Sequence, residues 1–189
     1  MPSYPLYLPN QSKIAPMPAN IEIKARVRDL AGLSKRAEAL SDTPFQVILQ
    51  EDTFFNTAHG RLKLRQLAPE RGQLVYYERG DTAGPKRSNY LIVETSDPSA
   101  LKAALTAALG VRGIVRKRRN LYLAGQTRIH LDEVEGLGQF MELEVVLRPE
   151  QSDTEGQAIA ADLMVKLGVA QADLLEGAYM DLLEKNERD

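Results

Sequence analysis

The feature that most constrains the fold of this chain is a strict alternation of polar and apolar side chains that begins at Asn20. Over nine residues the order is Asn20, Ile21, Glu22, Ile23, Lys24, Ala25, Arg26, Val27 and Arg28. Side chains repeat every two residues along a β-strand and about every 3.6 residues along an α-helix. This segment is therefore predicted to be a strand with one apolar face and one charged face.

Further segments of strand type follow, separated by turn residues. They cover residues 46–55, 60–65, 73–79, 88–95, 111–122, 127–134 and 140–147. The short glycine-rich turn at residues 136–138 predicts that the last two strands form an antiparallel hairpin. Eight strands in hairpin order can close into a barrel that holds side chains or a small ligand.

Four segments have helical spacing instead. They cover residues 29–40, 97–109, 155–167 and 172–183. The second is the best defined, because Asp97 is an N-cap residue, Pro98 fits the first helical position and Gly110 ends the run. Strands with flanking and C-terminal helices place the chain in the α+β class.

The first 19 residues lack this patterning and hold five of the ten prolines. They are predicted to form an extended or disordered leader before a single domain at residues 20–185. A cytoplasmic protein without a membrane partner is expected, because the sequence has no signal peptide and no run of about 18 apolar residues. The absence of cysteine excludes thiolate chemistry, and a net charge of −2 argues against a general nucleic-acid binder.

The charged strand faces carry the functional signal. Basic side chains gather in the middle of the chain, as in Arg61, Lys63 and Arg65, while Glu142 and Glu144 stand near its end. One interpretation is that these are the solvent faces of an amphipathic sheet. A merely soluble surface usually mixes charge signs along each strand, however, because like charges on one face repel. The alternative is that the charged faces line the interior of the barrel.

Glu142 and Glu144 are candidate metal ligands. Two residues apart on a strand, they share one face and lie about 6.6 Å apart at the backbone. That spacing suits one shared divalent cation or two neighbouring ones. Carboxylate oxygens favour Mg²⁺ or Mn²⁺ over zinc. A carboxylate-held metal beside basic groups is the arrangement that grips a polyphosphate.

Taken in order, the segments of this chain resemble the CYTH superfamily, also called triphosphate tunnel metalloenzymes. Residues 20–24 resemble a degenerate form of its Glu-x-Glu-x-Lys signature, with Asn20 in place of the first glutamate. The resemblance continues through residues 60–65, 75–79, 86–90, 115–119, 128–138, 140–144 and 176–183. The Tyr-x-Arg, Lys-x-Ser-x-Tyr and Leu-Asp-x-Val-x-x-Leu-Gly patterns look closer to the class IV adenylyl cyclase branch than to vertebrate thiamine triphosphatases.

The resemblance implies an eight-stranded antiparallel barrel with a charged tunnel, which binds a triphosphate and Mg²⁺ or Mn²⁺. By motif position, the phosphate-binding residues are Lys24, Arg26, Lys63, Arg65, Arg79, Lys117, Arg119 and Arg128. The metal ligands, or residues that support them, are Glu22, Asp132, Glu142 and Glu144. Glu22, Lys24, Glu142 and Glu144 are the implied catalytic residues. A monomer or homodimer acting on ATP, thiamine triphosphate or inorganic triphosphate is expected.

Two classes of function remain open at this point. The first is an enzyme, either a cyclase that converts ATP to cyclic AMP and pyrophosphate or a triphosphate hydrolase, since both need the same charge neutralisation. The second is a non-catalytic nucleotide- or polyphosphate-binding protein. Asn20 favours the second class, because a neutral amide holds a metal more weakly than a carboxylate does.

Residues outside the charged motifs have competing interpretations. His130 shares a strand face with Asp132, so it is either a proton carrier in the tunnel or an ordinary hydrogen-bonding residue. Arg118 belongs either to the tunnel rim or to a solvated face. Tyr179 and Leu183 are expected to pack across one mouth of the barrel.

Overall fold

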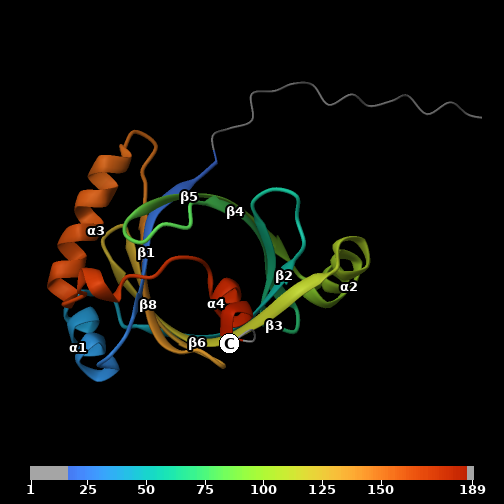
Figure 1. Cartoon of the computed structure of the whole chain (residues 1–189), viewed down its shortest axis with the longest axis horizontal. Coiled ribbons are helices and arrows are strands. Elements are labelled where there is room, and N and C mark those ends of the chain that lie inside the picture. The colour runs from blue at the N-terminus through green and yellow to red at the C-terminus, as the bar shows by residue number, and fades with distance from the viewer. Residues whose placement is uncertain (1–16, 187–189) are drawn as a thin grey trace, which may run out of the picture.

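The computed structural model describes residues 17–186, in which eight strands form a closed antiparallel barrel (Figure 1). The strands are β1 (Ala19–Arg26), β2 (Gln46–Phe55), β3 (Arg61–Ala68), β4 (Arg71–Arg79), β5 (Lys86–Thr95), β6 (Val111–Ala124), β7 (Thr127–Val134) and β8 (Gly138–Val146). Around the barrel their order is β1-β5-β4-β3-β2-β6-β7-β8. Each predicted strand is confirmed, with its ends shifted by a few residues, and so is the α+β barrel.

Helices cover part of the outer surface of the barrel. On one side lie α1 (Leu30–Leu40) and α3 (Asp153–Leu167), and on the other lies α2 (Pro98–Leu109) (Figure 1). Leu33 of α1 and Leu163 of α3 pack on Ile129 and Leu143 in one buried apolar cluster. None of the helices in the described part of the chain combines the length and hydropathy needed to cross a membrane.

The helix ends follow from local sequence. The Asp97 side chain accepts a hydrogen bond from the Ala100 amide at 2.9 Å, which satisfies an amide that has no partner within α2. Gly110 ends the helix with a φ of 72°, a conformation that glycine adopts without steric cost. At α3, Ser152 and Glu155 form a reciprocal capping box.

The alternation in β1 places its apolar face outside and its charged face inside. Ile21 and Ile23 are at most 1% exposed because helix α3 covers them. Glu22 and Lys24 point instead into the barrel, where β8 presents Glu144 and Glu142 opposite them. The charged strand faces therefore line the interior of the barrel, and the interpretation as a solvent-exposed sheet face is wrong.

The C-terminal region differs from the prediction of one helix at residues 172–183. A short 3₁₀ turn at Gln171–Asp173 is followed by an extended strap at residues 174–178 and then by α4 (Tyr179–Asn186). The strap follows β1, since the Leu175 amide donates to the Lys24 carbonyl at 2.8 Å. Gly177, with a φ of 72°, turns the chain into α4.

Helix α4 lies within one mouth of the barrel (Figure 1). Tyr179 and Met180 at its start pack on Phe54, Val115 and Phe140 in a second buried apolar cluster. The prediction that Tyr179 packs across a barrel mouth is confirmed.

The leader predicted at residues 1–19 falls mostly outside the described residues, because residues 1–16 are not described. The Pro18 carbonyl accepts a hydrogen bond from the Tyr90 amide at 3.0 Å, and β1 begins at Ala19.

Candidate functional site

The interior of the barrel encloses a cavity of about 570 Å³. That volume falls within the roughly 300–1,000 Å³ of typical ligand pockets. Eight basic side chains and four carboxylates line the cavity. The basic ones are Lys24, Lys63, Arg65, Arg71, Arg79, Lys117, Arg119 and Arg128, and the carboxylates are Glu22, Asp52, Glu142 and Glu144. The wall therefore carries an excess of positive charge.

Strand β2 gives the order of side chains along the cavity. Phe54 packs beside α4, and Asp52, Gln50 and Ile48 follow toward the opposite mouth. Strand β6 shows the same order, with Val115 near α4, then Lys117 and Arg119, and then Leu121. Closure of the barrel thus gathers charges from all parts of the chain into its middle.

Asp52 is the centre of one charged group in the cavity wall, which also contains Lys63 and Arg65. It is 2% exposed and accepts hydrogen bonds from Lys63 Nζ at 2.8 Å and from Arg65 Nε at 3.0 Å. Sequence reasoning missed Asp52. Three consecutive apolar residues, Val47 to Leu49, precede it in β2 and obscure which face of that strand points inward.

Burial and charge together set the protonation of this group. Burial alone would raise the pKa of Asp52, but Arg65 and Lys63 outweigh it and hold that pKa far below its usual value. Burial also lowers the pKa of Lys63 to about 8, although Asp52 opposes the shift. The charge that Lys63 offers to an anion therefore depends on pH in the range just above neutrality.

Asp132 is the centre of a second charged group, with Lys117 and Arg119, and lies behind the residues that line the cavity. It is fully buried and accepts hydrogen bonds from Lys117 Nζ at 2.8 Å and Arg119 Nε at 2.7 Å. The Tyr179 hydroxyl of α4 donates to it at 3.1 Å. With its oxygens engaged in this way, Asp132 is placed to orient Lys117 and Arg119 rather than to reach into the cavity.

Glu142 of β8 contacts Arg119 of the second group and one further basic residue, Lys24 of β1. It forms a buried ion pair with Lys24 and accepts a hydrogen bond from Arg119 Nη2 at 2.7 Å. Burial would raise the pKa of Glu142, but Lys24 and Lys117 outweigh it and keep the carboxylate ionised. The Lys24 ammonium also lies 3.3 Å from the centre of the Tyr179 ring, a cation–π contact.

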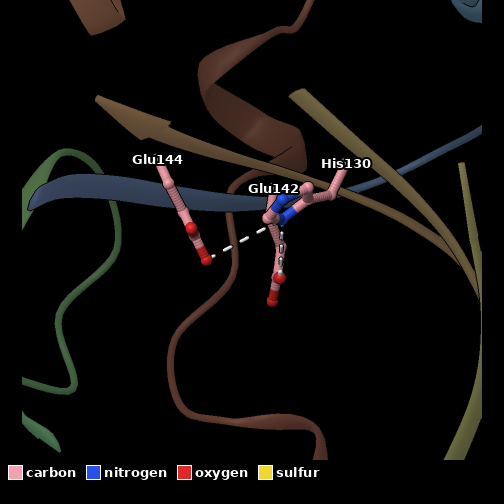
Figure 2. A group of neighbouring side chains, drawn as sticks. All are labelled: His130, Glu142 and Glu144. Atoms are coloured by element: carbon pink, nitrogen blue, oxygen red, sulfur yellow. Dashed lines mark ion pairs between the residues drawn. The ribbon is translucent and has the colours of Figure 1, made fainter. Parts of the chain in front are cut away.

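Three side chains meet in an arrangement that fits a divalent cation: His130, Glu142 and Glu144 (Figure 2). His130 Nδ1 lies 3.7 Å from Glu142 Oε2 and 3.8 Å from Glu144 Oε1. This nitrogen is buried and has no hydrogen-bond partner within residues 17–186. Burial, followed by the nearby Arg119, lowers the pKa of His130 and so favours the neutral imidazole that binds metals. The two carboxylates are donors that Mg²⁺ and Mn²⁺ prefer, whereas an imidazole is a donor for transition metals, so the set of three fits Mn²⁺ better than Mg²⁺.

Glu22, Arg79 and Asn20 form the third part of the site. Arg79 is ion-paired with Glu22, and its side chain is only 4% exposed. Its Nε and Nη2 atoms nevertheless have no hydrogen-bond partner in the described region. The Asn20 Oδ1 atom is likewise buried in the cavity wall and unpartnered there. Buried donors and acceptors without hydrogen-bond partners are costly in a folded protein, which points to a ligand that completes them.

The structure brings together most of the predicted site residues, but not all of them. Arg26 is exposed at the end of β1 and does not line the cavity. Arg118 points outward and pairs with Glu133 at 3.0 Å, so it belongs to a solvated face and not to the tunnel rim. Arg112 binds Asp181 at 2.6 Å and so holds α4 in place.

Comparisons with known proteins agree with this architecture. The CYTH domain family model matches residues 18–179. The adenylate cyclase CyaB of Aeromonas hydrophila is 26% identical over 176 residues, which cover 88% of this chain and 89% of that protein.

Two solved archaeal structures have the same fold. The PH1012 protein of Pyrococcus horikoshii OT3 superposes with a TM-score of 0.76 at 27% identity, over 87% of this chain and 99% of that one. The PH1819 protein of the same organism has a TM-score of 0.71 at 20% identity, over 88% of this chain and 99% of the other.

Proposed function

The chain belongs to the CYTH domain family, and we propose that it is a divalent-metal-dependent enzyme that binds ATP in the barrel lumen and converts it to cyclic AMP and pyrophosphate. One observation carries the proposal. Eight basic side chains line a cavity whose wall holds four carboxylates, and two nitrogens of the buried Arg79 lack hydrogen-bond partners in the described region. A triphosphate supplies the negative charge and the acceptor oxygens that this wall lacks.

The phosphate-binding residues in this proposal are seven of the eight basic side chains that line the cavity. They are Lys24, Lys63, Arg65, Arg79, Lys117, Arg119 and Arg128. Arg119 and Lys117 are held in place by Asp132, and Lys63 and Arg65 by Asp52. Such preorganisation lowers the entropy that ligand binding costs, because these side chains are already ordered.

His130, Glu142 and Glu144 would hold the metal ion. When bound, Mg²⁺ or Mn²⁺ neutralises phosphate oxygens and so stabilises the charge that develops during phosphoryl transfer. Glu142 and Glu144 pair with Lys24 and Arg128 in the structure described. An entering triphosphate attracts these two basic groups, which frees carboxylate oxygens for metal binding.

Cyclisation requires the 3′-hydroxyl oxygen of ATP to attack the α-phosphorus. The bond from that phosphorus to the oxygen bridging the β-phosphate breaks, and pyrophosphate and a proton are released. The similarity to the Aeromonas adenylate cyclase, which extends along nearly nine-tenths of both chains, favours this reaction over hydrolysis. A second candidate is non-catalytic nucleotide binding, favoured by Asn20, whose amide brings no charge to the cavity.

Product analysis tests the proposed reaction. The full chain is incubated with ATP, inorganic triphosphate and thiamine triphosphate, each with Mg²⁺ and with Mn²⁺. We expect cyclic AMP and pyrophosphate from ATP. Orthophosphate from any of the three would identify a hydrolase instead, and bound but unchanged ATP would identify a binding protein.

The Glu144→Gln variant tests the metal site. We expect metal-dependent turnover to fall at least about tenfold, because an amide is a weaker ligand for Mg²⁺ than a carboxylate. ATP affinity in EDTA should stay the same or rise, because the cavity loses a negative charge. Glu133→Gln is the matched control, since Glu133 stands on the outer face of β7 and pairs with Arg118. Unchanged turnover of Glu144→Gln at limiting Mg²⁺ would remove Glu144 from the metal site.

A further inference from the structure

Tyr179, the first residue of α4, contacts two phosphate-binding residues of the proposed site without carrying a charge itself. The centre of its ring lies 3.3 Å from Lys24 Nζ and 4.7 Å from Lys117 Nζ. The residue is 5% exposed and lines the cavity together with both lysines. One aromatic ring on the helix that closes the barrel therefore contacts two ammonium groups at once.

The two lysines place like charges in one buried region. Both are largely shielded from solvent, so water does little to screen the repulsion between them. Each ammonium group pairs with a carboxylate, Lys24 with Glu142 and Lys117 with Asp132. The negative face of the Tyr179 ring adds an attraction for both cations. Because the ring approaches from α4, it holds the two ammonium groups on that side and leaves their cavity side to an anion.

The aromatic ring is itself held from several directions. Its hydroxyl donates to Asp132 at 3.1 Å, and the ring of Phe140 packs on it with the ring centres 5.2 Å apart. The helix that carries it is fixed by Asp181, which pairs with Arg112 at 2.6 Å and with Arg61 at 3.1 Å. A ring fixed in this way can order flexible lysine side chains before an anion binds, which lowers the entropy that binding costs.

Packing alone does not account for the place of Tyr179 in the site. Leu183, one turn further along α4, packs in the same apolar cluster but does not line the cavity. Within α4, whose residues are all described, Tyr179 alone lines the cavity. The helix thus contributes one side chain to the phosphate-binding wall, and that side chain is aromatic.

We propose that Tyr179 is a positioning residue, whose ring holds the ammonium groups of Lys24 and Lys117 in place for the phosphates of a triphosphate. This inference rests on the proposed function in one respect, that a triphosphate binds in the cavity, and it does not depend on cyclisation. Linkage makes the effect reciprocal. If α4 must be seated for the ring to order the lysines, a bound triphosphate also holds α4 in the barrel mouth.

Calorimetric titration of the full chain with inorganic triphosphate in EDTA tests the ring without metal or turnover. Tyr179→Leu removes the ring, and we expect the Kd to rise about tenfold. Tyr179→Phe keeps the ring and loses only the hydroxyl, so its Kd should stay within about twofold of the wild-type value. Leu183→Ala is the matched control, because it removes apolar packing from α4 and leaves the ring. Its Kd should also stay unchanged, provided that α4 remains seated most of the time.

Hydrogen exchange of the wild-type protein is a second measurement that needs no variant. The backbone amides of α4 should exchange about threefold more slowly, or slower still, when inorganic triphosphate is added, because the ligand opposes opening of the helix. The amides of α2, which lies on the outer surface of the barrel, are the internal control (Figure 1).

The outcomes separate this inference from the proposed function. Weaker binding by Tyr179→Leu alone, with slower exchange in α4, supports the role of the ring. Wild-type affinity in Tyr179→Leu, or an equal loss in Tyr179→Phe or Leu183→Ala, would overturn that role and leave the triphosphate site standing. Unchanged exchange in α4 would overturn it too, even if Tyr179→Leu fails to fold. If the wild type binds no triphosphate in EDTA or with Mg²⁺, both proposals are wrong.

Discussion

Lys63 and Asp52 determine part of the positive charge that the cavity offers to a ligand. Lys63 has a pKa of about 8 because it is buried, and Asp52 only partly compensates. Above that pH the amine loses its proton and its attraction for phosphate. We expect ATP affinity to fall about three- to tenfold between about pH 7 and about pH 9, as measured by calorimetry in EDTA.

Lys63→Arg is the matched variant for this pH dependence. An arginine keeps its charge throughout the range, so the fall in affinity should become smaller. The ionisation of ATP changes with pH in the same way in both titrations, so the difference between the two proteins reports on residue 63 alone. Desolvation lowers the pKa of the buried Lys24 as well. An identical pH profile for wild type and Lys63→Arg would contradict a phosphate-binding role for Lys63.

Asn20 offers a second test at the level of one residue. A glutamate there adds a negative charge to the cavity wall, so Asn20→Glu should lower the half-saturating Mn²⁺ concentration about three- to tenfold. The ratio of orthophosphate to cyclic AMP should also rise, because a better-held metal activates water. Asn89→Glu adds the same charge on the outer face of the neighbouring β5. If both variants behave as the wild type does, Asn20 is not near the metal.

Individual site residues were predictable to different degrees. Lys63, Arg65 and Glu144 stand on strictly alternating segments, so their shared faces could be identified without the structure. Asp52 could not, because the apolar residues before it make both faces of β2 look alike. Arg26 follows the alternation of β1 but stands at its end, beside Phe140 and outside the enclosed part of the barrel.

Among the elements, the strap and α4 depend on one glycine. Gly177 has a φ of 72°, and a Cβ there would lie 3.2 Å from the Asp181 carboxylate. Gly177→Ala should therefore reduce the free energy of unfolding by about 1–2 kcal/mol in urea denaturation. Gly80→Ala is the control, because that Cβ meets no atom within 4 Å and its φ is not positive. Equal stabilities would show that the strap does not need this conformation.

The same region explains why the last helix was predicted too long. Residues 172–183 contain enough apolar side chains at helical spacing to resemble one helix. Leu174, however, packs with the core under α1 and α3, while Leu175 packs with the cluster at α4. These two separate burial sites and the glycine after them favour an extended strap over a helix. The periodicity of the local sequence does not reveal such long-range packing, so the strap could not be predicted from it.

At the level of the whole molecule, the barrel separates charge between its inside and its outside. The chain carries 24 basic and 26 acidic residues, yet eight basic residues and four carboxylates line the cavity. Alternation predicted which residues share a strand face. It did not predict that β1 pairs with both β5 and β8, the contact that closes the barrel and turns the charged faces toward one another.

The central claim is that the charged interior binds a triphosphate, and one pair of variants tests it most directly. Arg128 in the cavity pairs with Glu144 at 3.2 Å, and Arg118 on the outer face pairs with Glu133 at 3.0 Å. The carboxylates left behind, Glu144 and Glu133, have side chains that are 21% and 48% exposed, so neither substitution leaves a deeply buried charge. The measurement is the ATP affinity of wild type, Arg128→Ala and Arg118→Ala by calorimetry. We predict a loss of about tenfold or more for Arg128→Ala and no change for Arg118→Ala. Equal affinities in all three proteins would contradict binding in the barrel interior.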